Sequence, residues 1–145
     1  MKPIFAALDE SERAPKVLSV AIRLALTFDA PLVLFRSVAL PAVALSPDGL
    51  PTPFDYQADA EKHAREALTA LAKKVPQGVK VRVVTAVDIP WQGVCETAKQ
   101  ENASLIVIGS HGYAGLDRLL GTTAAKVVNH ADRSVLVVRG DWPAA

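Results

Sequence analysis

Three groups of polar and glycine residues, far apart in the chain, have the chemistry of a phosphate and ribose site. Asp9 directly follows a short apolar run, and Gly109-Ser110-His111-Gly112 follows another. A third segment, Gly121-Thr122-Thr123, stands at the start of a helical pattern. Glycines let backbone N–H groups approach an anion, and a helix N-terminus adds N–H donors and a favourable dipole. These residue types indicate a site for a phosphorylated ligand, with Asp9 as an acceptor for ribose hydroxyls.

Each of these features also has an ordinary structural explanation. Two glycines after a strand are typical of a turn, and Thr122 or Thr123 is typical of a helix N-cap. Asp9 is typical of a loop carboxylate near the dipole of a following helix. The chain has no Gly-Lys pair, and so no Walker A loop, and no G-x-G-x-x-G segment. The residues alone leave both explanations open.

The apolar pattern predicts the elements that would position these residues. Runs rich in Val, Leu and Ile, with little alternation, are typical of strands covered on both faces. The predicted strands are residues 3–8, 31–38, 79–87, 104–108 and 134–139. The predicted helices are residues 11–28, 55–75, 90–102 and 122–131. Ser11 is expected to be the N-cap of the first helix, with Pro15 tolerated in its first turn.

This alternation predicts an α/β fold in a single domain, residues 1–145. The expected architecture is a doubly wound parallel sheet of five strands, flavodoxin- or Rossmann-like, in the order βαβαβαβαβ with helices on both faces. In such sheets ligands bind at the carboxyl ends of the strands, where the strand order reverses. If the first and fourth strands are neighbours, Asp9 and the glycine segment face one crevice. Residues 39–54, which contain four prolines, are expected to form an irregular loop, and residues 140–145 a tail.

Composition restricts the class of partner. Sixteen Lys and Arg against fifteen Asp and Glu leave a formal net charge of +1, without the basic stripe that nucleic acid or an anionic membrane surface attracts. Cys95 is the only cysteine, which excludes an intrachain disulfide and a multi-cysteine zinc site. No apolar run approaches the roughly 18 residues of a membrane span, and the first residues lack a signal-peptide apolar region. We therefore expect a cytoplasmic protein without nucleic-acid or membrane partners.

Three further side chains are expected to be structural. Cys95 falls within a helical pattern beside Val94 and is expected to be a small core residue. Trp91, at the start of the same pattern, is expected to take part in packing rather than to cover a ligand base. His130 is expected to meet carbonyls or the dipole at the end of the last helix.

Two segments resemble the universal stress protein family. Residues 109–139, GSHGYAGLDRLLGTTAAKVVNHADRSVLVVR, resemble its C-terminal signature, and the opening IFAALDESERAP is similar to its first strand and Asp-containing loop. Length and element order agree across essentially the whole chain. Nucleotide-binding members carry G-x2-G-x9-G-[S/T] after the fourth strand. Here Gly109, Gly112 and Gly121-Thr122 match, but the spacer at residues 113–120 is eight residues, one fewer than usual.

The resemblance implies a stress-response module that binds ATP, with or without Mg²⁺, and acts as a dimer. Asp9 would then contact the ribose or adenine side, and Val38 would offer backbone groups to the adenine edge. Ile108, Gly109 and Gly112 would line the ribose and first phosphates, and Gly121, Thr122 and Thr123 the outer phosphates. Arg118 is the only cation that the sequence places near the glycine segments, so any hydrolysis is expected to be slow.

Two alternatives stay open at this point. The shortened spacer is also consistent with a dimeric interaction protein whose vestigial pocket no longer fits phosphates. A weak autokinase or ATPase is the third hypothesis, with Ser110, Thr122 or Thr123 as phosphate acceptors.

The last predicted strand, residues 134–139, indicates how two copies would associate. At a sheet edge, its apolar segment would present unpaired backbone groups, which natural proteins normally cover. Pairing with the same strand of a second copy across a two-fold axis would cover them, and the family resemblance implies the same dimer. The predicted interface residues are Val135, Leu136, Val137 and Val138.

Overall fold

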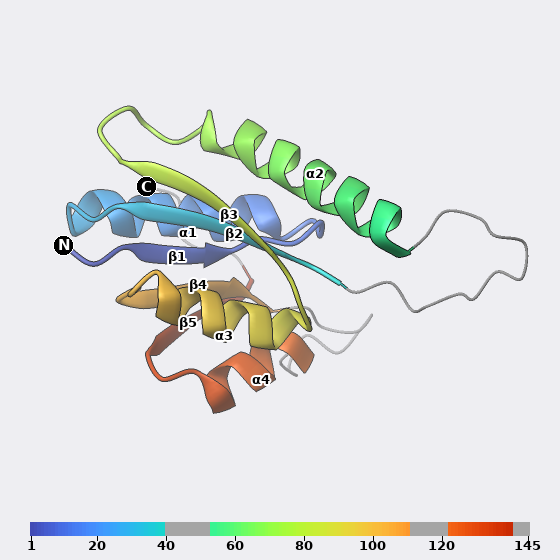
Figure 1. Ribbon diagram of the computed structural model, residues 1–145. Helices are drawn as coiled ribbons and strands as arrows, with labels where there is room; N and C mark the ends of the chain where they lie inside the picture. Colours follow the sequence, from blue (N-terminus) through green and yellow to red (C-terminus); the bar gives the residue numbers. More distant parts are fainter. Residues whose placement is uncertain (40–52, 111–121, 141–145) are drawn as a thin grey trace, which may run out of the picture.

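The computed structural model describes residues 1–39, 53–110 and 122–140, and strands alternate with helices throughout this part of the chain (Figure 1). In chain order the elements are β1 (Ile4–Ala7), α1 (Ala14–Thr27), β2 (Leu32–Val38), α2 (Pro53–Ala72), β3 (Val81–Val87), α3 (Pro90–Gln100), β4 (Leu105–Gly109), α4 (Thr122–His130) and β5 (Ser134–Val138). The predicted βαβαβαβαβ order is therefore confirmed.

The five strands form one parallel sheet in the order β3-β2-β1-β4-β5. The central strand is β1, in which Ala6 pairs with Leu34 of β2 on one side and with Val107 of β4 on the other. After β1 the chain builds the sheet outward to β3 and then returns to add β4 and β5 on the opposite side. The reversal of strand order therefore lies beside β1, and the first and fourth strands are neighbours.

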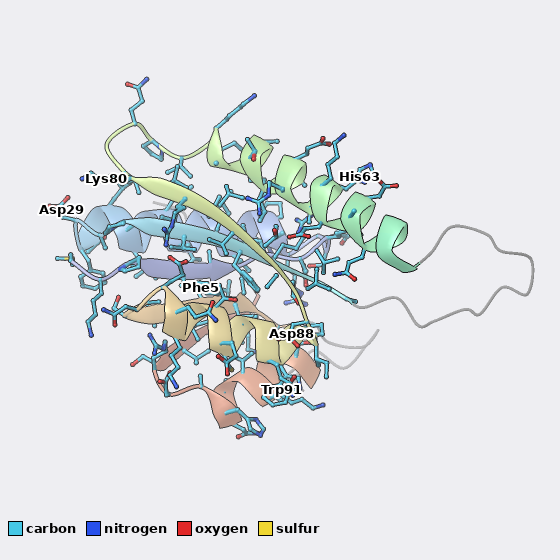
Figure 2. The ribbon with its side chains drawn as sticks, viewed as in Figure 1. Phe5, Asp29, His63, Lys80, Asp88 and Trp91 are labelled. Carbon is cyan, nitrogen blue, oxygen red and sulfur yellow. The ribbon has the colours of Figure 1, made fainter. Side chains whose placement is uncertain are left out.

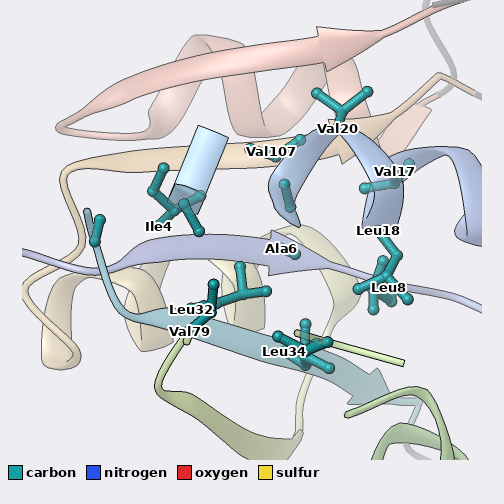
Figure 3. Close-up of a cluster of buried hydrophobic side chains, with 14 of the residues drawn as sticks. Ile4, Ala6, Leu8, Val17, Leu18, Val20, Leu32, Leu34, Val79 and Val107 are labelled. Atoms are coloured by element: carbon teal, nitrogen blue, oxygen red, sulfur yellow. The ribbon is translucent and has the colours of Figure 1, made fainter. Parts of the chain in front are cut away.

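Two helical layers cover the sheet, and the alternation of side chains along β1 shows which layer covers which face. Ile4 and Ala6 belong to a core cluster with α1 and α2 residues such as Val17 and Leu68, part of which Figure 3 shows. Phe5 belongs to the opposite cluster, which includes residues of α3 and α4. Because strand side chains alternate between faces, a run buried on both sides is apolar at nearly every position.

The aromatic centre of the second cluster joins two neighbouring strands. The rings of Phe5 in β1 and Phe35 in β2 lie 5.1 Å apart between centroids, at a tilt of 32°. Neither side chain is exposed to solvent. Tilted aromatic pairs at this separation stabilise a core beyond their buried area, so this contact helps to hold β1 and β2 together beneath their carboxyl ends.

The ends of several elements differ from the sequence prediction. Ser11 is not the N-cap of α1, because the helix begins at Ala14 with Arg13 in the cap position. Ser11 instead closes the preceding turn: its Oγ accepts the N–H of Arg13 at 3.2 Å, and its carbonyl accepts that of Ala14. Pro15 does lie in the first helical turn, where its missing N–H costs no hydrogen bond.

Other boundaries move by a few residues. Helix α2 begins at Pro53, so residues 53 and 54 were wrongly assigned to the loop, and proline is well suited to a first helical position. Strand β4 continues through Gly109, which therefore ends a strand rather than starting a loop. The rest of the proline-rich segment, residues 40–52, lies outside the described residues, as do residues 141–145 of the expected tail. No helix in the described ranges is long and apolar enough to span a membrane.

Candidate functional site

A pocket of about 220 Å³ lies at the carboxyl ends of β1, β2 and β4, where the strand order reverses. The segments at the ends of these three strands meet there with the first turns of α1, α3 and α4. The lining residues are Ala7, Leu8, Asp9, Ser11, Arg13, Ala14, Val17, Phe35, Arg36, Ser37, Pro90, Val94, Ile108, Gly109 and Thr123. This is the location at which doubly wound sheets bind ligands.

Several of the predicted site residues meet in this pocket. The lining includes Asp9, Ile108, Gly109 and Thr123, which lie up to 114 positions apart in the chain (123 − 9). Val38 is at the same end of β2 but not among the lining residues, and its carbonyl accepts the N–H of Asp88 at 3.1 Å. Its contact with a ligand stays a prediction.

The two inner glycines of the predicted phosphate loop, Gly112 and Gly121, lie outside the described residues, together with His111 and Arg118. Thr122 is the first residue of α4, and the next residue, Thr123, lines the pocket. The helix N-terminus predicted to face an anion is therefore at the pocket, while the loop that leads to it stays a prediction.

The Asp9 carboxylate is held by the turn that leads into α1. Its Oδ1 accepts the backbone N–H of Ser11 at 2.9 Å, and the side chain of Ser11 in turn accepts the N–H of Arg13. Asp9 is exposed, so its carboxylate is accessible from solvent. The arrangement presents an oriented acceptor at the edge of the pocket, which suits a ribose hydroxyl.

Arg36 is a site residue that the sequence analysis missed. From β2 it reaches the end of β1, where Nε donates to the carbonyl of Leu8 and Nη2 to the carbonyl of Asp9, both at 3.0 Å. The planar guanidinium presents these two donors in a fixed geometry, which a flexible lysine side chain would not do. Arg36 therefore fixes the backbone that carries the Asp9 carboxylate.

The expectation that Arg118 would be the only cation near the glycine segments was wrong. Arg13 and Arg36 both line the pocket. A Cβ built on Gly109 would lie 3.7 Å from the Cβ of Arg13, so the Arg13 side chain starts beside the first residue of the glycine segment. One signal could have revealed Arg36: it stands near the carboxyl end of a predicted strand, at the sheet edge where Asp9 was expected.

Gly109 has a packing role that the phosphate interpretation did not include. A Cβ at this position would meet Cγ2 of Val17 in α1 at 3.0 Å, closer than nearly all real contacts of a Cβ. The glycine therefore lets α1 pack against the end of β4. The next residue, Ser110, is only 2% exposed, and its N–H donates to the carbonyl of Val138. A hydroxyl buried to this degree is poorly placed to accept a phosphoryl group.

The pocket lining combines an apolar wall with three charged side chains. Ala7, Phe35 and Ile108 provide apolar surface from three adjacent strands, and α3 adds Pro90 and Val94. Arg13, Arg36 and Asp9 are the charged lining residues. Such a pocket can hold a flat apolar group against this wall and a hydroxylated, anionic group near the charged side chains.

A second, more open groove lies along α3 and is bordered by His130 at the end of α4. Trp91 packs against the core cluster, and its ring lies 4.5 Å from that of His130, which confirms the packing role expected for Trp91. His130 Nδ1 lies 2.8 Å from the carbonyl oxygen of Lys126 in the last turns of α4, as predicted. Figure 2 shows Asp88 and Trp91 together at the start of α3.

Cys95 lies in this groove and is half-buried, so it is less completely a core residue than expected. Burial raises the pKa of its thiol above the ordinary value, and the nearby carboxylates of Asp132 and Glu96 raise it further. A raised pKa keeps the thiol protonated and unreactive. Over residues 1–39, 53–110 and 122–140, no three His, Cys, Asp or Glu side chains are grouped so that they could hold a metal ion.

Comparison with known proteins identifies the relatives of this chain. Residues 1–139 match the model of the universal stress protein family. The chain is 34% identical to "Universal stress protein A homolog 1" of Coxiella burnetii over 140 residues, which cover 94% of this chain and 95% of that protein.

Solved structures show the same fold. "Universal stress protein UspA from Lactobacillus plantarum" superposes with a TM-score of 0.81 at 25% identity, covering 95% of this chain and 97% of that one. "Structure of the universal stress protein from Archaeoglobus fulgidus in complex with dAMP" superposes with a TM-score of 0.68 at 22% identity, covering 96% and 98%.

Proposed function

Because the chain belongs to the universal stress protein family, we propose that it is a regulatory protein that binds an adenine nucleotide, ATP above all, in the pocket beside β1. The observation that carries this proposal is the pocket itself, which combines an apolar wall with Asp9, Gly109 and Thr123 at the switch point of the sheet. The relative from Archaeoglobus fulgidus that was solved with dAMP supports the choice of an adenine ligand.

In this proposal each part of the nucleotide meets a different surface of the pocket. The base lies against the apolar wall formed by residues such as Phe35 and Ile108, and the ribose hydroxyls donate to Asp9. The phosphates extend past Gly109 toward the N-terminus of α4 at Thr123, where backbone N–H groups and the helix dipole favour an anion. By family resemblance, Val38 approaches the adenine edge, and Gly112, Gly121 and Thr122 complete the phosphate site, with Mg²⁺ accompanying ATP.

We expect any hydrolysis to be slow. Among the described lining residues Asp9 is the one carboxylate, and its Oδ1 already accepts the N–H of Ser11. Efficient phosphoryl transfer needs a group that orients the attacking water together with cations placed on the transferred phosphate. The nucleotide would then act by its presence, as a signal that partners sense, rather than as a substrate. The buried position of Ser110 argues against it as an autokinase acceptor.

Calorimetric titration with ATP and Mg²⁺ tests the proposal directly. The purified protein is first freed of any co-purified nucleotide by unfolding and refolding. Asp9→Asn should then weaken ATP binding by roughly tenfold, because it replaces a charged acceptor by a neutral one. Glu10→Gln is the matched control, since Glu10 is the adjacent exposed carboxylate and does not line the pocket; it should leave the affinity unchanged. Absence of binding by the folded wild-type protein would leave the vestigial pocket as the better explanation.

We also propose that two copies pair through β5. In the described part of the chain β5 forms one edge of the sheet. The carbonyl of Val138 accepts the N–H of Ser110 and so faces β4; because backbone groups alternate along a strand, those of Val135 and Val137 face outward. An apolar edge of this kind is normally covered, and an antiparallel pairing of Val135, Leu136, Val137 and Val138 with a second copy would cover it.

The opposite edge is less suited to pairing. At β3 the hydroxyl of Thr85 accepts a bond from Arg65 and donates to Glu61, both in α2. Charged side chains along an edge discourage association. This contrast favours β5 as the strand that pairs.

Analytical ultracentrifugation tests the dimer. Wild type should sediment as a dimer at micromolar concentration, and Val137→Pro as a monomer, because proline removes an outward N–H while edge strands tolerate it. A matched Thr85→Pro variant in the β3 edge should not change the sedimentation coefficient. A wild-type monomer at all concentrations would contradict the proposed interface.

A further inference from the structure

We propose that Arg13 is the residue by which the pocket recognises the phosphate of its ligand, so that the site selects a phosphorylated adenine nucleotide over uncharged adenosine. This inference rests on the proposed function. It concerns a residue that neither the glycine pattern nor the family resemblance singles out, since it belongs to the α1 end of the pocket rather than to the loop before α4.

The position of Arg13 is the first argument. It occupies the N-cap position of α1, and its Cβ lies within 3.7 Å of where a Cβ on Gly109 would be. The side chain therefore begins beside the residue at which the phosphate segment starts. Arg13 lines the pocket and is half-buried, so an ion pair formed there is screened less than one on the open surface.

The distribution of charge is the second argument. The charged lining residues are Asp9, Arg13 and Arg36, which sum to one positive charge. Arg36 uses two of its nitrogens to hold the carbonyls of Leu8 and Asp9, so it acts as a positioning residue at the ribose end. Arg13 adds positive charge to the lining, and its side chain starts beside Gly109, where the phosphate segment begins.

The chemistry of the side chain is the third argument. A guanidinium recognises phosphate through two parallel N–H···O bonds, which adds direction as well as charge. Lysine at the same place would keep the charge and lose the fork. A neutral side chain would lose both and would leave the contacts of base and ribose untouched. Selectivity between AMP and adenosine is therefore the property that Arg13 controls.

Calorimetric titrations with AMP and with adenosine test this inference. We expect wild type to bind AMP at least about tenfold more tightly than adenosine. Arg13→Gln should weaken AMP binding by about tenfold and change adenosine binding by less than about twofold. The AMP affinity of Arg13→Lys should lie between those of wild type and Arg13→Gln. Arg23→Gln is the matched control, because Arg23 lies in α1, which Arg13 caps, and is also half-buried but does not line the pocket. It should match wild type for both ligands.

A salt titration of the unmodified protein gives a second measurement that does not depend on whether a variant folds. The ratio of the affinity for AMP to the affinity for adenosine should fall as the salt concentration is raised from about 50 to 500 mM, because screening weakens only the charged contact. A ratio of affinities that does not change with salt would overturn the inference. So would an Arg13→Gln variant that loses affinity for AMP and adenosine equally, or that loses affinity for neither. Equal wild-type affinities for AMP and adenosine would overturn it while sparing the adenine site. Binding of neither AMP, adenosine nor ATP would overturn the proposed function as well.

Discussion

The backbone of Gly109 can pack against Val17 only because position 109 has no side chain, since a Cβ there would lie 3.0 Å from Cγ2 of Val17. The pair joins the end of β4 to the start of α1, directly beside the pocket. The neighbour is an aliphatic carbon of a buried side chain, so it has little room to move. Gly109 therefore serves the packing of the site as well as any approach of a phosphate.

Gly109→Ala should lower the free energy of unfolding by about 1–3 kcal/mol, because the added methyl overpacks a filled core. Adding Val17→Ala to this variant should recover part of the loss, so the double-mutant cycle should show a favourable coupling. Urea denaturation monitored by circular dichroism measures all four proteins. Gly78→Ala is the control, because a Cβ at Gly78 meets nothing within 4 Å; equal stability of the two alanine variants would contradict the packing role.

Arg36→Met should both destabilise the protein and weaken nucleotide binding. The variant removes the donors to the carbonyls of Leu8 and Asp9. The bond to Leu8 is part-buried, and leaving its carbonyl without this partner costs about 1–3 kcal/mol. The loop that carries the Asp9 carboxylate then loses its anchor. Urea denaturation and ATP titration measure the two effects. Arg65→Met, which breaks an exposed bond to Thr85, should change neither by a comparable amount, and equal behaviour of both variants would argue against a special role for Arg36.

Arg133 should contribute more to stability than a surface arginine does. Its side chain is 14% exposed, and Nη1 donates to the carbonyls of Ala98 and Ala103, at 3.0 and 2.8 Å. Arg133→Met should cost about 2–3 kcal/mol, since two carbonyls at the end of α3 lose a charged donor. Thermal and urea unfolding measure the difference. Arg139→Met serves as control because Arg139 is exposed; a comparable loss in that variant would show that the effect is not specific to the two carbonyls.

Cys95 should react slowly with iodoacetamide near neutral pH. Burial, and then the charges of Asp132 and Glu96, raise the pKa of its thiol, and only the thiolate is the nucleophile. The pH–rate profile of the folded protein should therefore have a higher midpoint than that of the protein unfolded in guanidinium chloride. Asp132→Asn should move the midpoint partly back toward the unfolded value. A lower midpoint for the folded protein than for the unfolded protein would show that folding lowers the pKa of Cys95, contrary to this prediction.

The same shift has a consequence for stability. The pKa of the Cys95 thiol is higher in the folded protein than in the unfolded protein. The contribution of this thiol to the free energy of unfolding is therefore fully present below the unfolded pKa and is lost as pH rises through the folded pKa. Cys95→Ala should therefore flatten the alkaline limb of the stability–pH curve in the region around and above pH 8.5, the ordinary thiol pKa.

The type and order of the elements could be predicted from the sequence because the buried strands are apolar at almost every position. Their ends could not, because local hydrogen bonds decide them. Ser11 has the residue type of an N-cap, yet its Oγ accepts the N–H of Arg13 in a turn and α1 starts three residues later. Pro53 looked like the last proline of a loop and instead begins α2. A short run of residues carries too little information to separate such neighbouring alternatives.

By itself the sequence determined that strands and helices alternate and that Asp9 and Gly109 lie at the carboxyl ends of strands to within one or two residues. It also contained the family resemblance that the comparison confirmed. Only the tertiary structure decided which strands are neighbours, and so which side chains share the pocket. Arg36 reaches the carbonyl of Leu8, 28 positions away, and Arg13 starts beside Gly109. Parallel pairing places the carboxyl ends of β1, β2 and β4 at one edge whatever their separation along the chain, and no local pattern records that proximity.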